Sequence, residues 1–199
     1  MKEVNFELFH GTTKKVADKI LKENKFIPGE DLDNEDFLGK GVYFFKEKEH
    51  AILWNLKKAK DNRMRNLSYE YYILKYAVLK ANLTIMRNNL LDLNYPKDIV
   101  KYEKIVNRFG KEFINDKDYN DAKHKERAII NYLYKHHYMD GIYVIRKFEG
   151  QKTKTTKLNV GDYIQREVLC IKKEQLLKNI KMEPNINKET YYEIKKIYI

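Results

Sequence analysis

Three short segments, far apart in the chain, carry side chains suited to one kind of chemistry. They are His10-Gly11-Thr12, the segment GKGVYF at 39–44, and Glu167. A bond between a ribose and a flat, cationic aromatic ring breaks through a transition state that resembles an oxocarbenium ion, as in glycoside hydrolysis. Breaking it calls for aromatic faces around the ring, backbone groups for the ring's polar substituent and a carboxylate near the sugar. The three segments together offer such groups.

Each side chain has a role that fits this chemistry. Gly11 lets a ligand approach the backbone closely, and His10 can hydrogen-bond a ribose hydroxyl. Tyr43 offers one aromatic face, and Trp54, on the helix that follows, offers a second. Glu167 can fix a ribose hydroxyl and stabilise the developing positive charge. The alternative is structural: a strand-end histidine, two aromatic rings in the core and a solvated carboxylate at a strand edge.

In this order, the segments resemble the His-Tyr-Glu class of ADP-ribosyltransferases, which includes the poly(ADP-ribose) polymerases and diphtheria-toxin-like enzymes. The resemblance rests on the His10-Gly11 pair, on GKGVYF at 39–44, and on Glu167 before the apolar run VLCI, with Gln175-Leu176 after it. It spans the chain from residue 9 to about residue 177, in islands. The HG pair alone is weak, and the three elements in order carry the signal.

The resemblance implies an α+β fold with two packed antiparallel sheets, NAD in the cleft between them and helices outside. It implies one catalytic domain over residues 1–199, with NAD as substrate and no metal. Glu167 would be catalytic together with Tyr43 and His10. The NAD-binding residues would be His10, which holds the nicotinamide ribose and the adenosine side, Gly11, whose backbone pairs with the carboxamide, Thr12 in the same segment, and Tyr43 and Trp54, which sandwich the nicotinamide.

Two positions depart from the family pattern. Ala51 stands where the polymerases usually have a serine that hydrogen-bonds the carboxamide, and Trp54 stands where they have a second tyrosine. The first change removes one hydrogen bond to NAD, while the second keeps the stacking. In addition, Gln165-Arg166-Glu167 resembles the Gln-x-Glu element of arginine- and asparagine-modifying toxins. Gln165 is therefore predicted to contact the acceptor, although the arginine and the Ser-Thr-Ser-like segment of those toxins are not found.

Hydrophobic periodicity predicts the elements that position these residues. Strands are expected at 4–9, 42–45, 71–86, 142–145, 168–171 and, at the tail, 191–199. Helices are expected at 14–21, after an N-cap threonine, at 47–60 and over most of 90–138. Glu167 would open its strand. The order of these elements lacks a regular βαβ alternation, which favours an α+β fold.

The composition is that of a soluble protein with a strongly basic balance. The 40 Lys and Arg residues against 29 Asp and Glu give a net charge of +11. Such an excess favours polyanionic partners, RNA or DNA somewhat over protein, although an AT-rich genome produces the same richness in lysine without selection. No apolar run has transmembrane length, the pattern of residues 1–9 favours a first strand over a signal peptide, and the only cysteine is Cys170. We therefore expect a cytoplasmic protein that does not contact membranes.

The predicted activity is transfer of a single ADP-ribose from NAD to a macromolecular acceptor, with release of nicotinamide. The small size and the basic charge suggest a toxin or anti-phage defence setting, in which a neutralising antitoxin would be a partner. NAD hydrolysis without an acceptor is one alternative. A tRNA 2′-phosphotransferase shares the fold but uses a basic constellation instead of Tyr43 and Glu167. A catalytically inactive module that binds nucleic acid or ADP-ribose is the alternative from a different class.

Overall fold

The computed structural model describes most of the chain, namely residues 2–26, 28, 37–61, 67–115, 125–152 and 163–198. The acidic stretch at 30–36 and most of the Lys/Thr-rich stretch at 151–157 lie outside these residues.

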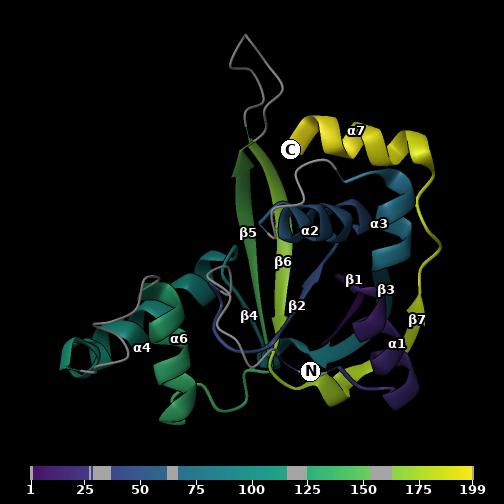
Figure 1. Cartoon of the computed structure of the whole chain (residues 1–199). Coiled ribbons are helices and arrows are strands. Elements are labelled where there is room, and N and C mark those ends of the chain that lie inside the picture. Colours follow the sequence, from purple (N-terminus) through teal and green to yellow (C-terminus); the bar gives the residue numbers. More distant parts are fainter. Residues whose placement is uncertain are drawn as a thin grey trace.

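The described strands form one mixed sheet in the order β4-β5-β6-β2-β1-β3-β7, drawn in Figure 1. The strands are β1 (Glu3–Thr13), β2 (Val42–Phe45), β3 (Tyr76–Met86), β4 (Leu90–Asp92), β5 (Val144–Lys152), β6 (Tyr163–Ile171) and β7 (Leu177–Met182). All neighbouring strands are antiparallel except β4 and β5, which are parallel.

The helices lie on both sides of this sheet. They are α1 (Lys14–Glu23), α2 (Lys48–Asp61), α3 (Tyr69–Lys75), α4 (Pro96–Asn115), α6 (Lys125–Lys135) and α7 (Lys188–Tyr198). In Figure 1, α2, α3 and α7 lie together near one end of the sheet, whereas α1 lies near β7. Among the described helices, none combines the length and apolar character needed to cross a bilayer. The α+β class is confirmed.

The sheet is not uniformly paired. The ladder between β1 and β3 runs from Glu3–Met86 to Thr13–Tyr76, and that between β5 and β6 runs from Val144–Ile171 to Lys152–Tyr163. The ladder between β1 and β2, in contrast, consists of one pair, Phe9–Phe45. We call this junction the β1–β2 seam. The expected pair of separate, purely antiparallel sheets is thus not what the described residues form: they make one mixed sheet that is nearly divided at the seam.

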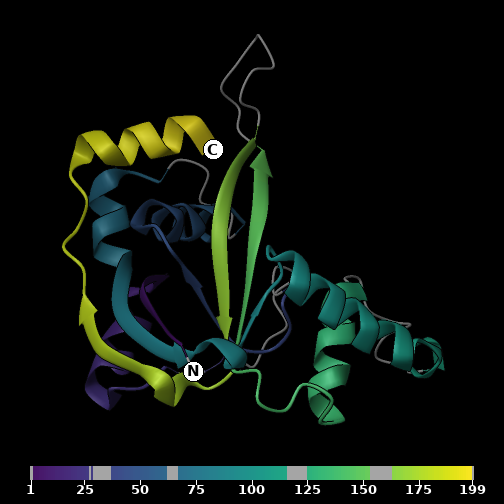
Figure 2. The ribbon, with the colours of Figure 1, turned by 180° about the vertical axis from the view of Figure 1, so that it is seen from behind.

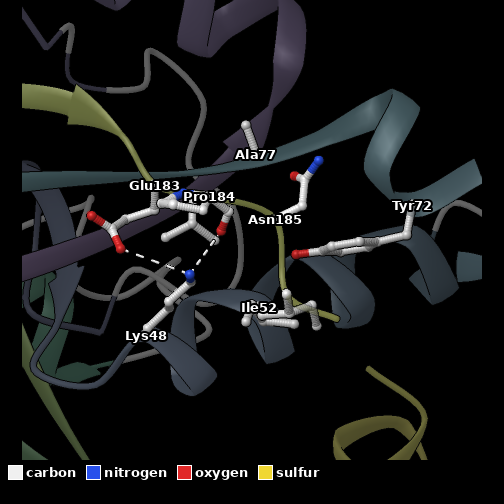
Figure 3. Close-up of a pocket in the computed structure, with 9 residues that line it drawn as sticks. Lys48, Ile52, Tyr72, Ala77, Glu183, Pro184 and Asn185 are labelled. Carbon is white, nitrogen blue, oxygen red and sulfur yellow. Dashed lines mark hydrogen bonds and ion pairs between the residues drawn. The ribbon is translucent and has the colours of Figure 1, made fainter. Parts of the chain in front are cut away.

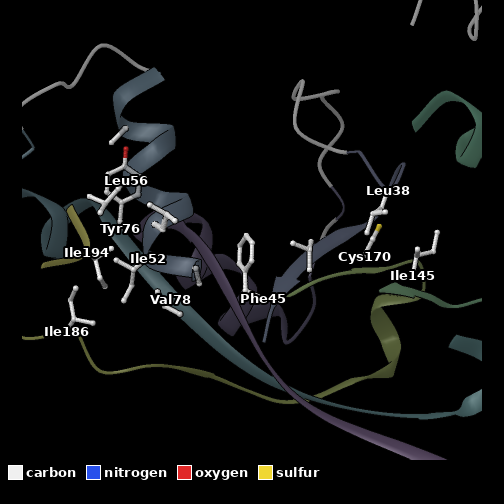
Figure 4. Packing of buried hydrophobic residues seen from close by; sticks show 14 of the residues in the cluster. Leu38, Phe45, Ile52, Leu56, Tyr76, Val78, Ile145, Cys170, Ile186 and Ile194 are labelled. Carbon is white, nitrogen blue, oxygen red and sulfur yellow. The ribbon is translucent and has the colours of Figure 1, made fainter. Parts of the chain in front are cut away.

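Two hydrophobic clusters, one on each face of the sheet, form the core. Because side chains alternate along a strand, Tyr43 and Phe45 point to the face covered by α2, and Phe44 points to the face covered by α1. The α2-face cluster joins strand residues to α2, α3 and α7, as Figure 4 shows for part of it. The α1-face cluster joins Ala17 and Ile20 of α1 to β1, β3, β6 and β7.

The helices α4 and α6 form an arm beside β4. Figures 1 and 2 show both helices projecting away from α2, α3 and α7. The arm lies within the crossover that joins the parallel strands β4 and β5. Its inner surface packs against the α2-face cluster through residues of both helices, among them Tyr102, Phe109 and Leu133.

The first part of the predicted strand at 71–86 and the predicted strand at 191–199 are helical, because capping side chains start helices there. Residues 69–75 form α3, which Ser68 caps by accepting a hydrogen bond from the backbone N–H of Tyr71. The tail forms α7 instead of a strand, because Asn187 caps it through the backbone N–H of Thr190 and the buried Tyr191 and Ile194 recur at helical spacing. The predicted N-cap of the first helix is confirmed, since Thr13 accepts from the N–H of Val16.

Candidate active site

His10 connects β1 to β2 beyond the end of their ladder. Its Nδ1 lies 2.8 Å from the backbone oxygen of Tyr43. Because a carbonyl can only accept, Nδ1 carries the proton, and Nε2 of a neutral ring is left with its lone pair. The imidazole therefore replaces a ladder hydrogen bond across the seam and keeps one acceptor nitrogen.

The surroundings of His10 keep its ring uncharged near neutral pH. The half-buried ring lies against Phe26 and Phe44, with ring centroids 5.3 and 5.4 Å away. Burial lowers the pKa of His10 to about 4, helped by Lys58 and opposed by the hydrogen bond to Tyr43. The neutral ring can accept a hydrogen bond from a ligand hydroxyl at Nε2.

Tyr43 is locked by the turn that precedes its own strand. Its hydroxyl donates to the backbone oxygen of Gly39 at 2.8 Å and accepts from the N–H of Leu38 at 2.9 Å. Its ring lies near that of Phe37, with centroids 6.2 Å apart. The side chain is half-buried. One ring orientation is thus fixed without any ligand, which is the preorganisation that a stacking face requires.

The glycines of the GKGVYF segment have structural reasons of their own. Gly39 has φ +75°, and a Cβ there would lie 2.6 Å from Oδ1 of Asn131 in α6. The same Oδ1 accepts from the backbone N–H of Lys40 at 2.7 Å. A Cβ on Gly41 would lie 2.5 Å from Sγ of Cys170 in β6. The motif is therefore a turn held between α6 and β6, and it sets the direction of Tyr43.

Gly11 allows α2 to pack directly onto β1. A Cβ at this position would lie 2.2 Å from the backbone oxygen of Ala51 and 2.9 Å from Oδ1 of Asn55. From the sequence we expect this glycine to allow close approach of a ligand, and the structure adds close approach of a helix. Ala51 is completely buried at this contact. Thr12, the next residue of β1, is half-buried and pairs with Ala77.

Trp54 lies on α2, as predicted, but its ring has cationic neighbours. Phe45 lies 6.0 Å away between centroids. The Nζ of Lys58 and the guanidinium carbon of Arg166 lie 5.2 and 5.9 Å from the ring centroid. Arg166 is itself buried and ion-paired with Glu149, its Nε lying 2.6 Å from Oε2. A cationic ligand that stacks on Trp54 would therefore compete with Lys58 and Arg166 for the ring.

Glu167 lies within β6 and not at its start, because the strand already begins at Tyr163. Its Oε1 forms an ion pair with Nε of Arg146 in β5, at 2.7 Å. Nη1 of Arg146 donates to Oδ2 of Asp92 in β4, at 3.0 Å. The side chain of Glu167 is 14% exposed. Arg146 thus orients the predicted catalytic carboxylate of Glu167, and the carboxylate of Asp92 orients Arg146.

Gln165 is exposed on the same face of β6 as Glu167, because the two are separated by one residue. On β5, Gly150 lies opposite Gln165, and Phe148 lies opposite Glu167. Such a surface position is open to a second substrate.

The structure brings the three motif segments onto three adjacent strands, β1, β2 and β6. His10 and Glu167 point to the α1 face, while Tyr43 and the helix that carries Trp54 lie on the α2 face. His10 and Tyr43 flank the β1–β2 seam, and Glu167 lies on β6, the next strand beyond β2. In a strand, every second residue directs its backbone N–H and C=O toward the same neighbouring strand. Because the β1–β2 ladder consists of the pair Phe9–Phe45, the residues of β1 after Phe9 direct backbone groups toward the β2 side without a ladder pair there.

Arg146, the partner of Glu167, is a site residue that the sequence did not predict. No motif marks this arginine, and it lies 21 residues before Glu167 in the sequence but beside it across the β5–β6 ladder. Only the register of the two strands, which pairs Phe148 with Glu167, brings the two side chains to one face.

A small hollow lies away from these residues. It is formed by α2, β3 and the segment before α7, and in Figure 3 Lys48 reaches toward Glu183 and Pro184 at its edge. It contains none of the predicted site residues; its lining is Lys48, Ile52, Tyr72, Ala77, Val78, Glu183, Pro184, Asn185 and Ile186. Within the described residues, no group of three or more His, Cys, Asp and Glu side chains is placed to hold a metal ion.

The chain is similar to a distant archaeal protein. An uncharacterized protein of Methanocaldococcus jannaschii is 28% identical over 135 residues, which are 68% of this chain and 59% of that protein. The chain therefore spans less than two thirds of its relative's length. No protein-family model and no solved structure matches the chain.

Proposed function

We propose that this chain is an NAD-dependent mono-ADP-ribosyltransferase that acts at the β1–β2 seam. The observation that carries the proposal is the convergence of three separate motif segments on adjacent strands, with His10 bonded to the backbone of Tyr43. Packing of a hydrophobic core does not by itself require that these three segments lie on adjacent strands. These adjacent strands carry the histidine, the aromatic ring and the carboxylate that cleavage of a nicotinamide–ribose bond needs, the ring on one face of the sheet and the other two on the opposite face.

In this proposal the nicotinamide ring lies at the seam, against the fixed ring of Tyr43 and near Trp54. Backbone groups of Gly11 bind its carboxamide, with Thr12 next to them. Nε2 of His10 accepts a hydrogen bond from a ribose hydroxyl, which its neutral state permits. Ala51 supplies no side-chain hydrogen bond, so the affinity for NAD depends on stacking and on the backbone.

Glu167 stabilises the transition state from the neighbouring strand. The bond between ribose C1′ and the ring nitrogen breaks heterolytically, and the electron pair leaves with nicotinamide, which becomes neutral. The positive charge remains on the ribose and is stabilised by the carboxylate. An acceptor nucleophile then bonds to C1′ and loses its proton. Arg146 holds Glu167 in place during these steps.

The test uses NAD labelled in its ADP-ribose part, incubated with the purified protein and a cell extract. Protein, RNA and DNA are then separated, and released nicotinamide is measured alongside. Glu167→Gln should lower nicotinamide release and transfer by about 100-fold or more, while NAD affinity changes little. Glu7→Gln is the matched control, because Glu7 is an exposed, lysine-paired carboxylate on β1. It should keep full activity.

The outcomes separate the proposal from its alternatives. Label in one macromolecular fraction, lost in Glu167→Gln, supports the transferase and names the acceptor class. Nicotinamide release without transferred label would indicate an NAD glycohydrolase. Full activity in a folded Glu167→Gln protein, or no nicotinamide release from the wild type, would overturn the proposal.

A further inference from the structure

The outer surface of α4 carries a row of cations. Its side chains are exposed and recur at intervals of four, three and four residues: Lys97, Lys101, Lys104 and Arg108. At 100° per residue these intervals keep all four within a narrow arc of the helix. At 1.5 Å per residue the row is about 16 Å long, roughly the length of five nucleotides of a stacked strand at 3.4 Å each. We call it the α4 cation row.

No carboxylate interrupts the α4 cation row. Asp98 faces the sheet, where its Oδ2 accepts from Nη2 of Arg87 and from the backbone N–H of Asp92. Glu103 lies about 100° around the helix from Lys104. Within the part of the chain that the structure describes, no ion pair joins the four cations to an acidic side chain. Their charge is thus presented to solvent along one line.

Two exposed aromatic rings continue from the row toward Glu167. Tyr95, immediately before α4, is 44% exposed, and the guanidinium carbon of Arg87 lies 5.4 Å from its ring centroid. Phe148 is 41% exposed and lies 5.8 Å from the guanidinium carbon of Arg146. Phe148 lies directly opposite the predicted catalytic carboxylate in the β5–β6 ladder.

A hydrogen bond ties these two aromatic positions together. Oδ1 of Asn94 accepts from the backbone N–H of Phe148 at 2.6 Å, so the start of α4 is fixed to β5 beside that ring. Along the backbone, the cation row is thus followed by Tyr95 and Asn94, then by Phe148 on β5 and by Glu167 across the β5–β6 ladder. A row of cations followed by exposed aromatic rings is the combination that binds single-stranded nucleic acid, with phosphates on the cations and bases stacked on the rings.

We propose that the α4 cation row, Tyr95 and Phe148 form a binding surface for single-stranded nucleic acid that leads to Glu167. The phosphate backbone lies along the row, and bases stack on the two rings. The binding part stands on this surface alone. The clause that the strand is delivered to Glu167 as acceptor rests on the proposed transferase function.

The first experiment measures binding of fluorescent 20-nucleotide DNA and RNA strands to the full chain without NAD, at several salt concentrations. Four phosphate contacts predict a slope of log K against log salt of about −3, or roughly 50-fold weaker binding at 200 mM than at 50 mM salt. Replacing all four cations of the row by glutamine should remove most of this slope. Tyr95→Ala and Phe148→Ala should each weaken binding by about five- to 100-fold.

A matched control removes the same charge from another exposed helix. In α1, four exposed lysines are replaced by glutamine: Lys14, Lys15, Lys19 and Lys22. This variant should bind nearly as well as the wild type. Equal loss in both quadruple variants, a flat salt dependence in the wild type, or preferential binding to phosphatidylserine vesicles would overturn the proposal.

Binding and catalysis fail separately in this design. If the wild type releases no nicotinamide but binds strands through the α4 cation row, the transferase proposal fails and the binding surface stands. If the wild type transfers ADP-ribose, the α4 variant should lose transfer to the strand while it keeps nicotinamide release. Unchanged transfer to the strand by that variant would show that the α4 cation row does not deliver the acceptor to Glu167.

Discussion

The β5–β6 ladder and the β1–β2 seam both join neighbouring antiparallel strands, but they do so with very different amounts of backbone pairing. Between β5 and β6 the backbone pairing is continuous from Val144–Ile171 to Lys152–Tyr163. Between β1 and β2 one backbone pair remains, and the imidazole of His10 supplies the next link. The ladder fixes Arg146 against Glu167, whereas the seam leaves backbone groups of β1 without partners on β2. A rigid side and an open side therefore meet at the candidate site.

The largest change in stability should come from filling the space between β1 and α2, next to the β1–β2 seam. Gly11→Ala places a methyl group 2.2 Å from the backbone oxygen of Ala51, and a backbone oxygen cannot rotate away. We expect a loss of about 3 kcal/mol or more in the free energy of unfolding, measured in urea. A Gly11→Ala protein as stable as the wild type would show that α2 can move away from β1 at little cost.

A smaller effect, dependent on pH, should come from the histidine that bridges the seam. The pKa of His10 is about 4 in the folded protein and near 6.5 when unfolded, because burial disfavours its charged form. Between pH 6.5 and 4 the unfolded chain binds more protons, so the folded state loses stability as the pH falls and the loss levels off below pH 4. The full loss amounts to about 3 kcal/mol.

His10→Gln should remove that part of the pH dependence. The comparison is made by urea unfolding of both proteins at pH 7 and at pH 4.5. His50, whose pKa is also lowered by burial and by Arg166, contributes a residual slope of the same sign to both. Equal pH dependence in the two proteins would mean that His10 is not the group that titrates.

The smallest effect should come from a glycine outside both regions. Gly110 lies inside α4, and a Cβ there would meet nothing within 4 Å. Gly110→Ala should therefore raise the free energy of unfolding by about 0.5 to 1 kcal/mol, because alanine is the better helix former. This variant also serves as the control for Gly11→Ala. Destabilisation in both would show that the effect of the added methyl group does not depend on the seam.

Much of the fold could be predicted where a local signal was present. The strand at 4–9, the threonine cap of α1 and the glycine turn before Tyr43 all follow from local propensity, and the structure has them, although β1 continues through His10 to Thr13. The helix at 69–75 was misassigned because its tyrosines also suit a strand. Its cap, Ser68, was the signal that periodicity alone overlooked.

Features that depend on register could not be predicted from the sequence. The pair of Glu167 with Arg146, and the position of Phe148 opposite Glu167, follow from which residues of β5 and β6 face each other. A shift of one residue would send every side chain of a strand to the other face. The need for a glycine at position 11 could not be predicted either, since it depends on how closely α2 approaches β1.

The parallel pairing of β4 with β5 has a consequence for how such chains can diversify. Parallel neighbours cannot be joined by a tight turn, so an excursion out of the sheet is compulsory between them. The sheet dictates where that excursion leaves and returns but not how long it is. The α4–α6 arm occupies this excursion, at the far edge from β1. Descendants of this fold can therefore lengthen or recharge the exposed side of the arm while His10, Tyr43 and Glu167 stay in register, as long as Asn131 of α6 keeps its bond to the turn before Tyr43.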